Sequence, residues 1–272
     1  MSFYEFFNLF RKPRTLHYES LSPISNFHRG IPLPSVDMDY KSCDSCKSCE
    51  TLCPTKAIEV KKTSLRFDYG KCVQCGICKL ACPDEKILNS NITSVFALNR
   101  DSLVVEFSAE GPKSKEDLPS LSTQKFRELT KNRGFTYREV AAAGNNTVEC
   151  ELNASFNNVF DSESLGVRSV ASPKHADALL YSGPIGKNMQ TPLDITWECM
   201  PEPKALIACG TEAISGGLFA KGKTPRSPDL FIVGDPPRPD VILQSFRYLM
   251  GSYKHSLLEI ILNFYKSIGD KK

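Results

Sequence analysis

The chain has 272 residues, enough for about two domains at roughly 150 residues each. Its 41% hydrophobic and 24% charged residues are ordinary for a globular protein, and a net charge of +3 is too small to indicate a nucleic-acid-binding protein. No run of about 18 apolar residues occurs, so no membrane-spanning helix is expected. The N-terminus also lacks the charged and apolar regions of a secretory signal.

The N-terminal segment carries an aromatic stripe. Phe3, Phe6, Phe7 and Phe10 recur at the spacing of one helix face, and basic residues follow them. We expect a short amphipathic helix that packs on a partner subunit or on the chain's own core, with an anionic membrane surface as the alternative. Residues 1–40 are therefore interpreted as an N-terminal docking extension.

Eight of the eleven cysteines follow one spacing used twice, C-x2-C-x2-C-x3-C-P. The first run contains Cys43, Cys46, Cys49 and Cys53, and the second contains Cys72, Cys75, Cys78 and Cys82. Bacterial-type ferredoxins bind two 4Fe–4S clusters with this spacing, and the fourth cysteine of each run ligates the other cluster. The pattern predicts one cluster held by Cys43, Cys46, Cys49 and Cys82, and a second held by Cys72, Cys75, Cys78 and Cys53.

Zinc and disulfides are the alternatives to this iron–sulfur interpretation. Zinc sites typically use two C-x2-C pairs separated by a longer loop, and disulfides need an oxidising compartment. We therefore expect a reducing compartment and an α+β ferredoxin domain over residues 41–90. Within it, Ala57–Val60 and Ser64–Phe67 alternate like short strands between the two cysteine runs.

Residues 91–143 are interpreted as a linker between two domains. The phrases VFALNR and SLVVEFS are strand-like, and the polar stretch 110–122 has the composition of a linker. KFRELTKNRG predicts a short helix that ends at Gly134.

Residues 144–272 alternate strands with helices, which predicts a parallel α/β domain of the flavodoxin-like kind. Ligands of such sheets bind beyond the carboxyl ends of the strands. The expected strands are Ala178–Ser182, Ala205–Ala208 and Leu230–Val233, and the expected helices are Thr191–Met200, Pro239–Leu249 and the segment LLEIILNFYK.

Four phrases of the second half carry a family resemblance, namely SLGVRSVASPKHADALLYSGPI, MPEPKALIACG, SGGLF and VGDPPRPDVIL. They resemble, in order, the small proximal-cluster subunit of complex I and of membrane-bound group 4 NiFe hydrogenases. The first half, from FxxFxxLFRKPRT through FHRGIP to both cysteine runs, resembles the two-cluster ferredoxin subunit of the same complexes. The chain therefore looks like a fusion of two neighbouring subunits.

The resemblance implies a third, proximal 4Fe–4S cluster held by four cysteines, but this chain has kept one of them. Thr147, Cys150, Glu212 and Asp235 stand at the four positions. Because iron–sulfur clusters favour thiolate over carboxylate, we interpret this proximal site as degenerate and its cluster as absent. Glu212 and Asp235 could instead bind a hard metal, pair with a base such as Arg238, or be solvated near a helix N-terminus.

The resemblance also implies a function. It implies an electron-transfer subunit of a membrane-associated oxidoreductase complex, with a large subunit, membrane subunits and a soluble ferredoxin-type electron donor as partners. The expected location is the cytoplasmic face of the membrane, as a peripheral subunit. No Ser–His–Asp set, HExxH, P-loop or GxGxxG indicates a catalytic centre of its own. The alternative is a structural docking module that holds the large subunit against the membrane arm and has a vestigial redox role.

Overall fold

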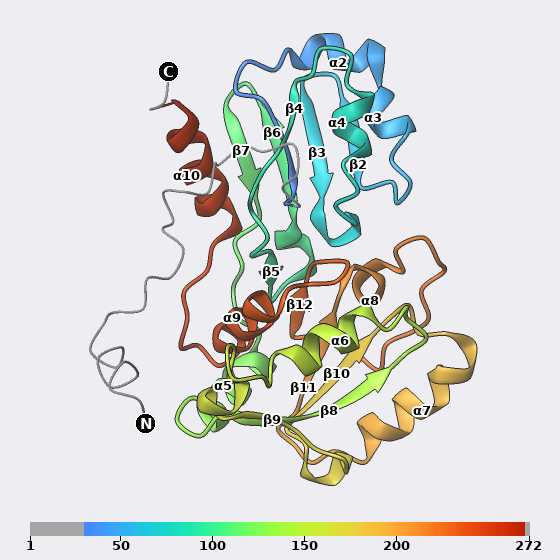
Figure 1. Ribbon diagram of the computed structural model, residues 1–272, viewed down its shortest axis with the longest axis vertical. Helices are drawn as coiled ribbons and strands as arrows, with labels where there is room; N and C mark the ends of the chain where they lie inside the picture. The colour runs from blue at the N-terminus through green and yellow to red at the C-terminus, as the bar shows by residue number, and fades with distance from the viewer. Residues whose placement is uncertain (1–29, 270–272) are drawn as a thin grey trace, which may run out of the picture.

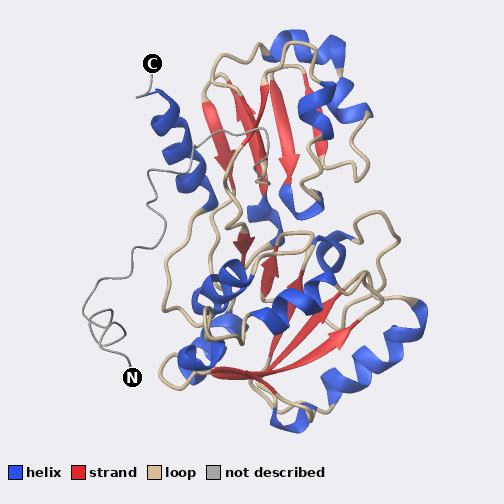
Figure 2. Cartoon of the chain, viewed as in Figure 1, coloured by secondary structure: helices blue, strands red, loops and turns tan. Residues whose placement is uncertain are grey.

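The computed structural model describes residues 30–269, so the aromatic helix expected around Phe3–Phe10 lies outside the described part of the chain. Figure 1 shows a four-stranded antiparallel sheet at the top of the view and a six-stranded, mainly parallel sheet below it. Helices flank both sheets, as Figure 2 shows by colour.

The part that contains the cysteine runs is an α+β unit. Its antiparallel sheet has the order β2 (Ile58–Lys61), β3 (Ser64–Asp68), β6 (Val104–Ser108) and β7 (Gly111–Ser114). A separate antiparallel pair consists of β1 (Pro32–Pro34) and β4 (Ile87–Asn89). The helical segments are α2 (Tyr40–Cys46), α3 (Ser48–Thr51), α4 (Ile77–Ala81), η2 (Tyr69–Lys71) and η3 (Arg100–Leu103). Both strands expected between the cysteine runs are confirmed as β2 and β3.

The second sheet has six strands in the order β5 (Phe96–Ala97), β12 (Leu230–Ile232), β11 (Ala205–Cys209), β10 (Ala178–Ser182), β8 (Phe135–Ala141) and β9 (Val167–Ser169). Neighbours from β12 to β9 are parallel, and β5 adds an antiparallel edge. β10 and β11 are buried along their whole length, as the continuous apolar runs in their sequences require. The expected parallel α/β domain is confirmed.

Helices cover both faces of this sheet. On one face, α5 (Leu121–Thr130), α6 (Thr147–Ala154) and α9 (Pro239–Leu249) pack on strand side chains such as Leu180 and Ile207. On the other, α7 (Lys187–Glu198) and α8 (Thr211–Ser215) pack on Leu179 and Leu206. The turns η4 (Ser162–Leu165) and η5 (Pro173–His175) complete the connections. Helix α9 begins at Pro239, as expected of a first-turn proline.

Residues 91–143 contribute strands to both sheets. β6 and β7 belong to the antiparallel sheet, whereas β5 and β8 belong to the parallel one. Within the stretch 110–122, whose composition is that of a linker, Gly111–Ser114 pairs with β6 as strand β7. A polar strand at a sheet edge has no alternation of apolar residues that would reveal it in the sequence.

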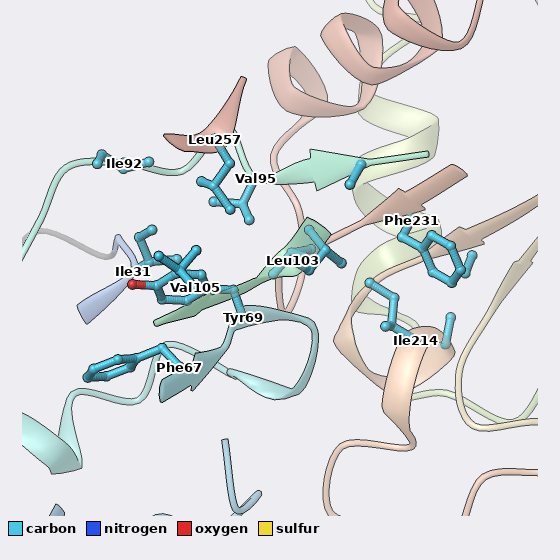
Figure 3. Packing of buried hydrophobic residues seen from close by; sticks show 14 of the residues in the cluster. Ile31, Phe67, Tyr69, Ile92, Val95, Leu103, Val105, Ile214, Phe231 and Leu257 are labelled. Atoms are coloured by element: carbon cyan, nitrogen blue, oxygen red, sulfur yellow. The ribbon is translucent and has the colours of Figure 1, made fainter. Parts of the chain in front are cut away.

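One hydrophobic core joins the two halves. Figure 3 shows Phe67 and Tyr69 of the ferredoxin unit in the same cluster as Ile214 and Phe231 of the α/β domain. Helix α10 (Leu257–Gly269) returns to the antiparallel sheet and packs beside β7, as Figure 1 shows. The hydroxyl of Tyr265 on this helix donates to the Pro34 carbonyl at 2.7 Å. The halves are therefore packed as one body.

In residues 30–269, no helix combines the length and the apolar character that crossing a membrane requires.

Candidate iron–sulfur sites and the adjacent sheet end

The first cysteine site lies at the outer end of the ferredoxin unit. Its cavity is lined by Cys43, Cys46, Cys49 and Cys82, together with apolar side chains such as Leu65 and Ile87. The first three cysteines come from α2 and α3, which Lys47 joins with a left-handed backbone at φ 49°. Cys82 follows α4 and therefore comes from the other run.

The second cysteine site lies toward the α/β domain. Its cavity is lined by the other four cysteines, Cys53, Cys72, Cys75 and Cys78, and by Phe67 and Ile58. Backbone N–H groups point at two of the sulfurs, since Ala57 donates to Cys53 Sγ at 3.2 Å and Gln74 donates to Cys72 Sγ at 3.4 Å. Such donors stabilise thiolate charge.

Burial and crowding disfavour thiolates in both cavities. Burial raises the pKa of Cys72 and of Cys78 to about 12, and that of Cys49 to about 11, with neighbouring cysteines adding to the effect. A cationic group inside each cavity would favour the thiolate form of these buried cysteines. All-cysteine ligation and the largely apolar lining fit an iron–sulfur cluster.

A single metal ion fits less well. Within residues 30–269, no group of three or more histidine, cysteine or acidic side chains has the spacing of ligands around one ion. Four thiolates around a cube of four irons stand further apart than four around one zinc ion. The spacing of the two cysteine runs is that of cluster-binding cysteines and differs from the two C-x2-C pairs that are typical of zinc sites.

The remaining cysteines lie in the α/β domain and are not grouped. Cys150 and Cys199 are exposed, whereas Cys209 is fully buried at the end of β11. Cys209 thus occupies the place of a small apolar core residue.

The four positions of the degenerate proximal site lie around the carboxyl end of the parallel sheet. Thr147 begins α6 and donates its hydroxyl to Asn145 Oδ1 at 2.6 Å, and Cys150 lies one turn further along that helix. Glu212 is on α8, after β11, and Asp235 follows β12. The fold thus brings these sequence positions to one end of the sheet.

Glu212 and Asp235 interact with each other. Burial raises the pKa of both carboxyls, and the charge of Asp235 raises that of Glu212 further. Asn145 opposes both shifts, through its backbone at Glu212 and its side chain at Asp235. Arg238 pairs with Asp240 at 3.0 Å, so the expected pairing of Asp235 with Arg238 is not formed.

Two further carboxylates in this region were missed in the sequence. Glu149 is 8% exposed and accepts a hydrogen bond from the Ser182 hydroxyl on β10, while its Oε2 has no partner. Burial and the nearby Glu149 raise the pKa of Glu139 on β8. Their positions, inside a strand for Glu139 and in the first turn of a helix for Glu149, are shared by many solvated glutamates and gave no signal.

The second cysteine site and this sheet end are in contact. The Thr211 hydroxyl donates to the Cys72 carbonyl at 3.2 Å. A surface cavity between the halves is lined by Cys75 from one side and by Asp235 and Pro237 from the other. The α/β domain therefore meets the ferredoxin unit at the cysteine site nearest to it.

Two four-cysteine cavities in a ferredoxin-type unit, packed on a parallel α/β domain, define an iron–sulfur protein. Residues 35–86 match the 4Fe-4S dicluster domain family. Residues 144–249 match the family described as NADH ubiquinone oxidoreductase, 20 Kd subunit, and the chain belongs to this family.

Curated relatives agree with this assignment. The chain is 33% identical to formate hydrogenlyase subunit 7 of Escherichia coli, over 50% of this chain and 55% of that protein. It is 34% identical to a probable membrane-bound hydrogenase subunit of Pyrococcus furiosus, over 36% of this chain and 63% of that protein. It is 32% identical to an uncharacterized protein of Methanocaldococcus jannaschii, over 44% of this chain and 85% of that protein. The chain thus spans between about half and two thirds of the first two relatives.

Proposed function

We propose that this protein is an electron-transfer subunit of a membrane-associated complex I-like or hydrogenase-related oxidoreductase complex. The observation that carries the proposal is the partition of eight cysteines around two cavities, each containing three cysteines of one run and the fourth of the other. A 4Fe–4S cluster, when bound, accepts and returns one electron. The relatives named as hydrogenase and hydrogenlyase subunits support the assignment to such a complex.

The chain's own residues would perform three tasks. Cys43, Cys46, Cys49 and Cys82 would hold one cluster, and Cys53, Cys72, Cys75 and Cys78 the other. The apolar linings would limit water access, and the backbone N–H groups at Cys53 and Cys72 would stabilise the sulfur charge. The exposed Cys46 and Cys75 mark where each site comes nearest to solvent or to a partner.

We further propose that the sheet end holds no third cluster. Cys150 is exposed, Thr147 is hydrogen-bonded to Asn145, and Glu212 and Asp235 offer carboxylates in place of thiolates. The partners would be a large subunit against the α/β domain, membrane subunits, and a soluble ferredoxin-type donor. The location would be the cytoplasmic face of the membrane, as a peripheral subunit.

The loss of three of the four thiolates also favours a second candidate function. On this alternative the α/β domain serves only to dock the large subunit against the membrane arm, and the redox role is vestigial. Reduction of the purified complex with its physiological donor separates the two, because an electron carrier becomes reduced during turnover and a structural module does not.

Iron and acid-labile sulfide per chain, measured on anaerobically purified protein, test the cluster count. About eight irons and two interacting paramagnetic signals are expected, and about twelve irons would refute the absence of a third cluster. The variant Cys150→Ala should leave the iron content unchanged.

A separate test addresses whether the fourth cysteine of each run ligates the cluster of the other run. Cys53→Ser should selectively alter the paramagnetic signal of the site that contains Cys72, Cys75 and Cys78. The matched variant Cys82→Ser should alter the other signal. If Cys53→Ser instead abolished the signal of the site that contains Cys43, Cys46 and Cys49, the proposed ligation would be contradicted.

A further inference from the structure

The two cysteine runs share one backbone turn but differ in the residue that follows it. After Cys46, Lys47 has a left-handed backbone at φ 49° and joins α2 to α3. In the second run, Gly76 has φ 77° and precedes α4 in the same way. The next residue is Ser48 in the first run and Ile77 in the second. The fold therefore presents a hydroxyl at one cysteine site and an apolar side chain at the equivalent place in the other.

The Ser48 hydroxyl contacts a cysteine sulfur. Its Oγ lies 3.1 Å from Cys46 Sγ, and both residues line the cavity of the first cysteine site. A hydroxyl and a thiol can each donate a hydrogen bond, but a cysteine that ligates iron is a thiolate and can only accept one. In the ligated form of the site, the Ser48 hydroxyl is therefore the donor and Cys46 Sγ the acceptor.

The second cysteine site has no hydroxyl contact of this length. Thr55 Oγ1 lies 3.8 Å from Cys53 Sγ, which is 0.7 Å longer than the Ser48 contact. Ile77 lines the second cavity and carries no group that can donate a hydrogen bond. The two sites therefore differ in a side-chain donor to sulfur, although their local backbone is alike.

A hydrogen bond to a ligand sulfur changes the ease of reduction. Reduction adds one negative charge to a cluster and its four thiolates, so the sulfurs become stronger acceptors. A donor at a sulfur thus stabilises the reduced form more than the oxidised form, and it raises the reduction potential. An apolar side chain at the same position gives no such stabilisation.

We propose that the Ser48 hydroxyl sets the reduction potential of the first cysteine site, raising it above the value that an apolar residue would give. This inference rests on the proposed function, because it requires a redox centre held by Cys43, Cys46, Cys49 and Cys82. Ser48 is a positioning residue, since it acts through Cys46. The transfer moves one electron from a one-electron donor protein to the first site, and no proton moves because the O–H bond of Ser48 stays intact.

The position of this contact suits electron entry. Cys46 is exposed, so the hydroxyl acts on the ligand at which the first site comes nearest to solvent or to a donor. The neighbouring cation, Lys47, lies 3.8 Å from the Asp44 carboxylate and its side chain is 49% exposed, so that carboxylate and the solvent weaken its effect on the sulfur. A higher potential at this site favours acceptance of an electron from the donor.

Reduction potentials of the complete protein, titrated anaerobically and followed by paramagnetic resonance, test the inference. Ser48→Ala should lower the potential of the first site by up to about 59 mV, which is a tenfold smaller equilibrium constant for a one-electron couple, and leave the second site unchanged. Ser48→Thr keeps a hydroxyl and should stay near the wild-type value. Ser45→Ala is the matched control, because Ser45 directly precedes Cys46 but donates its hydroxyl to the Ser42 carbonyl at 2.8 Å.

The converse variant Ile77→Ser should raise the potential of the second site, and Cys53→Ser and Cys82→Ser assign each signal to its site. An unchanged first potential in Ser48→Ala, or an equal shift in Ser45→Ala, would overturn the inference and leave the proposed function intact. If Ser48→Ala loses the first signal, Ile77→Ser decides: a raised second potential supports the inference and an unchanged one overturns it. Absence of both signals from the wild-type protein would refute the proposed function, and the inference with it.

Discussion

His255 predicts a fall in stability on acidification. Its ring stacks on Phe96 with centroids 3.8 Å apart and lies edge-on to Tyr248, and its Nε2 has no hydrogen-bond partner. Burial lowers the pKa of His255 from 6.5 to about 4, although the Asp117 carboxylate and the Phe96 backbone oppose this. The folded protein therefore keeps the ring neutral at pH values where the unfolded chain protonates it.

The size of the effect follows from that pKa difference. Because the unfolded chain binds more protons in this range, the stability present above pH 6.5 is lost as the pH falls toward 4. At 1.36 kcal/mol for each pKa unit, the full loss is about 3 kcal/mol, of which about 2 kcal/mol is reached at pH 5. That loss corresponds to about a thirtyfold increase in opening of this part of the core.

Amide hydrogen exchange in β5 and β12 measures this opening. Protection, corrected for intrinsic exchange, should fall about twentyfold between pH 7 and pH 5 in the anaerobic wild-type protein, because a small part of the change has already occurred at pH 7. His255→Phe keeps a ring against Phe96 but cannot protonate, so its protection should change much less. Equal pH dependence in the two proteins would refute the assignment to His255.

Two further substitutions test the packing between elements. Thr211→Val removes the fully buried hydroxyl that binds the Cys72 carbonyl, so it should lower the free energy of unfolding by about 1–2 kcal/mol and leave the iron content unchanged. Gly183→Ala should lower the thermal midpoint more than Gly111→Ala, because both glycines have positive φ but only a Cβ at Gly183 would lie 2.3 Å from the Gly144 nitrogen. Similar midpoints for the two alanine variants would contradict the close approach of these loops.

The sequence was most informative where spacing itself determines structure. The C-x2-C-x2-C-x3-C-P runs fix local turns, so the association of each fourth cysteine with the other run could be expected, and the cavities group Cys53 and Cys82 in that way. Helix α9 was likewise predictable, because Pro239 favours a first helical turn. The absence of a third cluster at the proximal site stays a prediction.

Features that depend on packing between distant elements could not be read from the chain. Strand β7 is polar, and only its hairpin with β6 makes Gly111–Ser114 a strand. Glu149 is polar by type, yet the rotation of α6 against β10 buries it beside Ser182. No periodicity distinguishes such a glutamate from one that faces water, so neither Glu139 nor Glu149 could be identified before the fold was known.

The return of α10 to the antiparallel sheet has a consequence for biosynthesis. Leu257, Ile261 and Phe264 share a core with β-strand residues that emerge from the ribosome long before them. The apolar core residues of the ferredoxin sheet therefore stay partly uncovered during translation of the whole α/β domain, until α10 has been synthesised and packs beside β7.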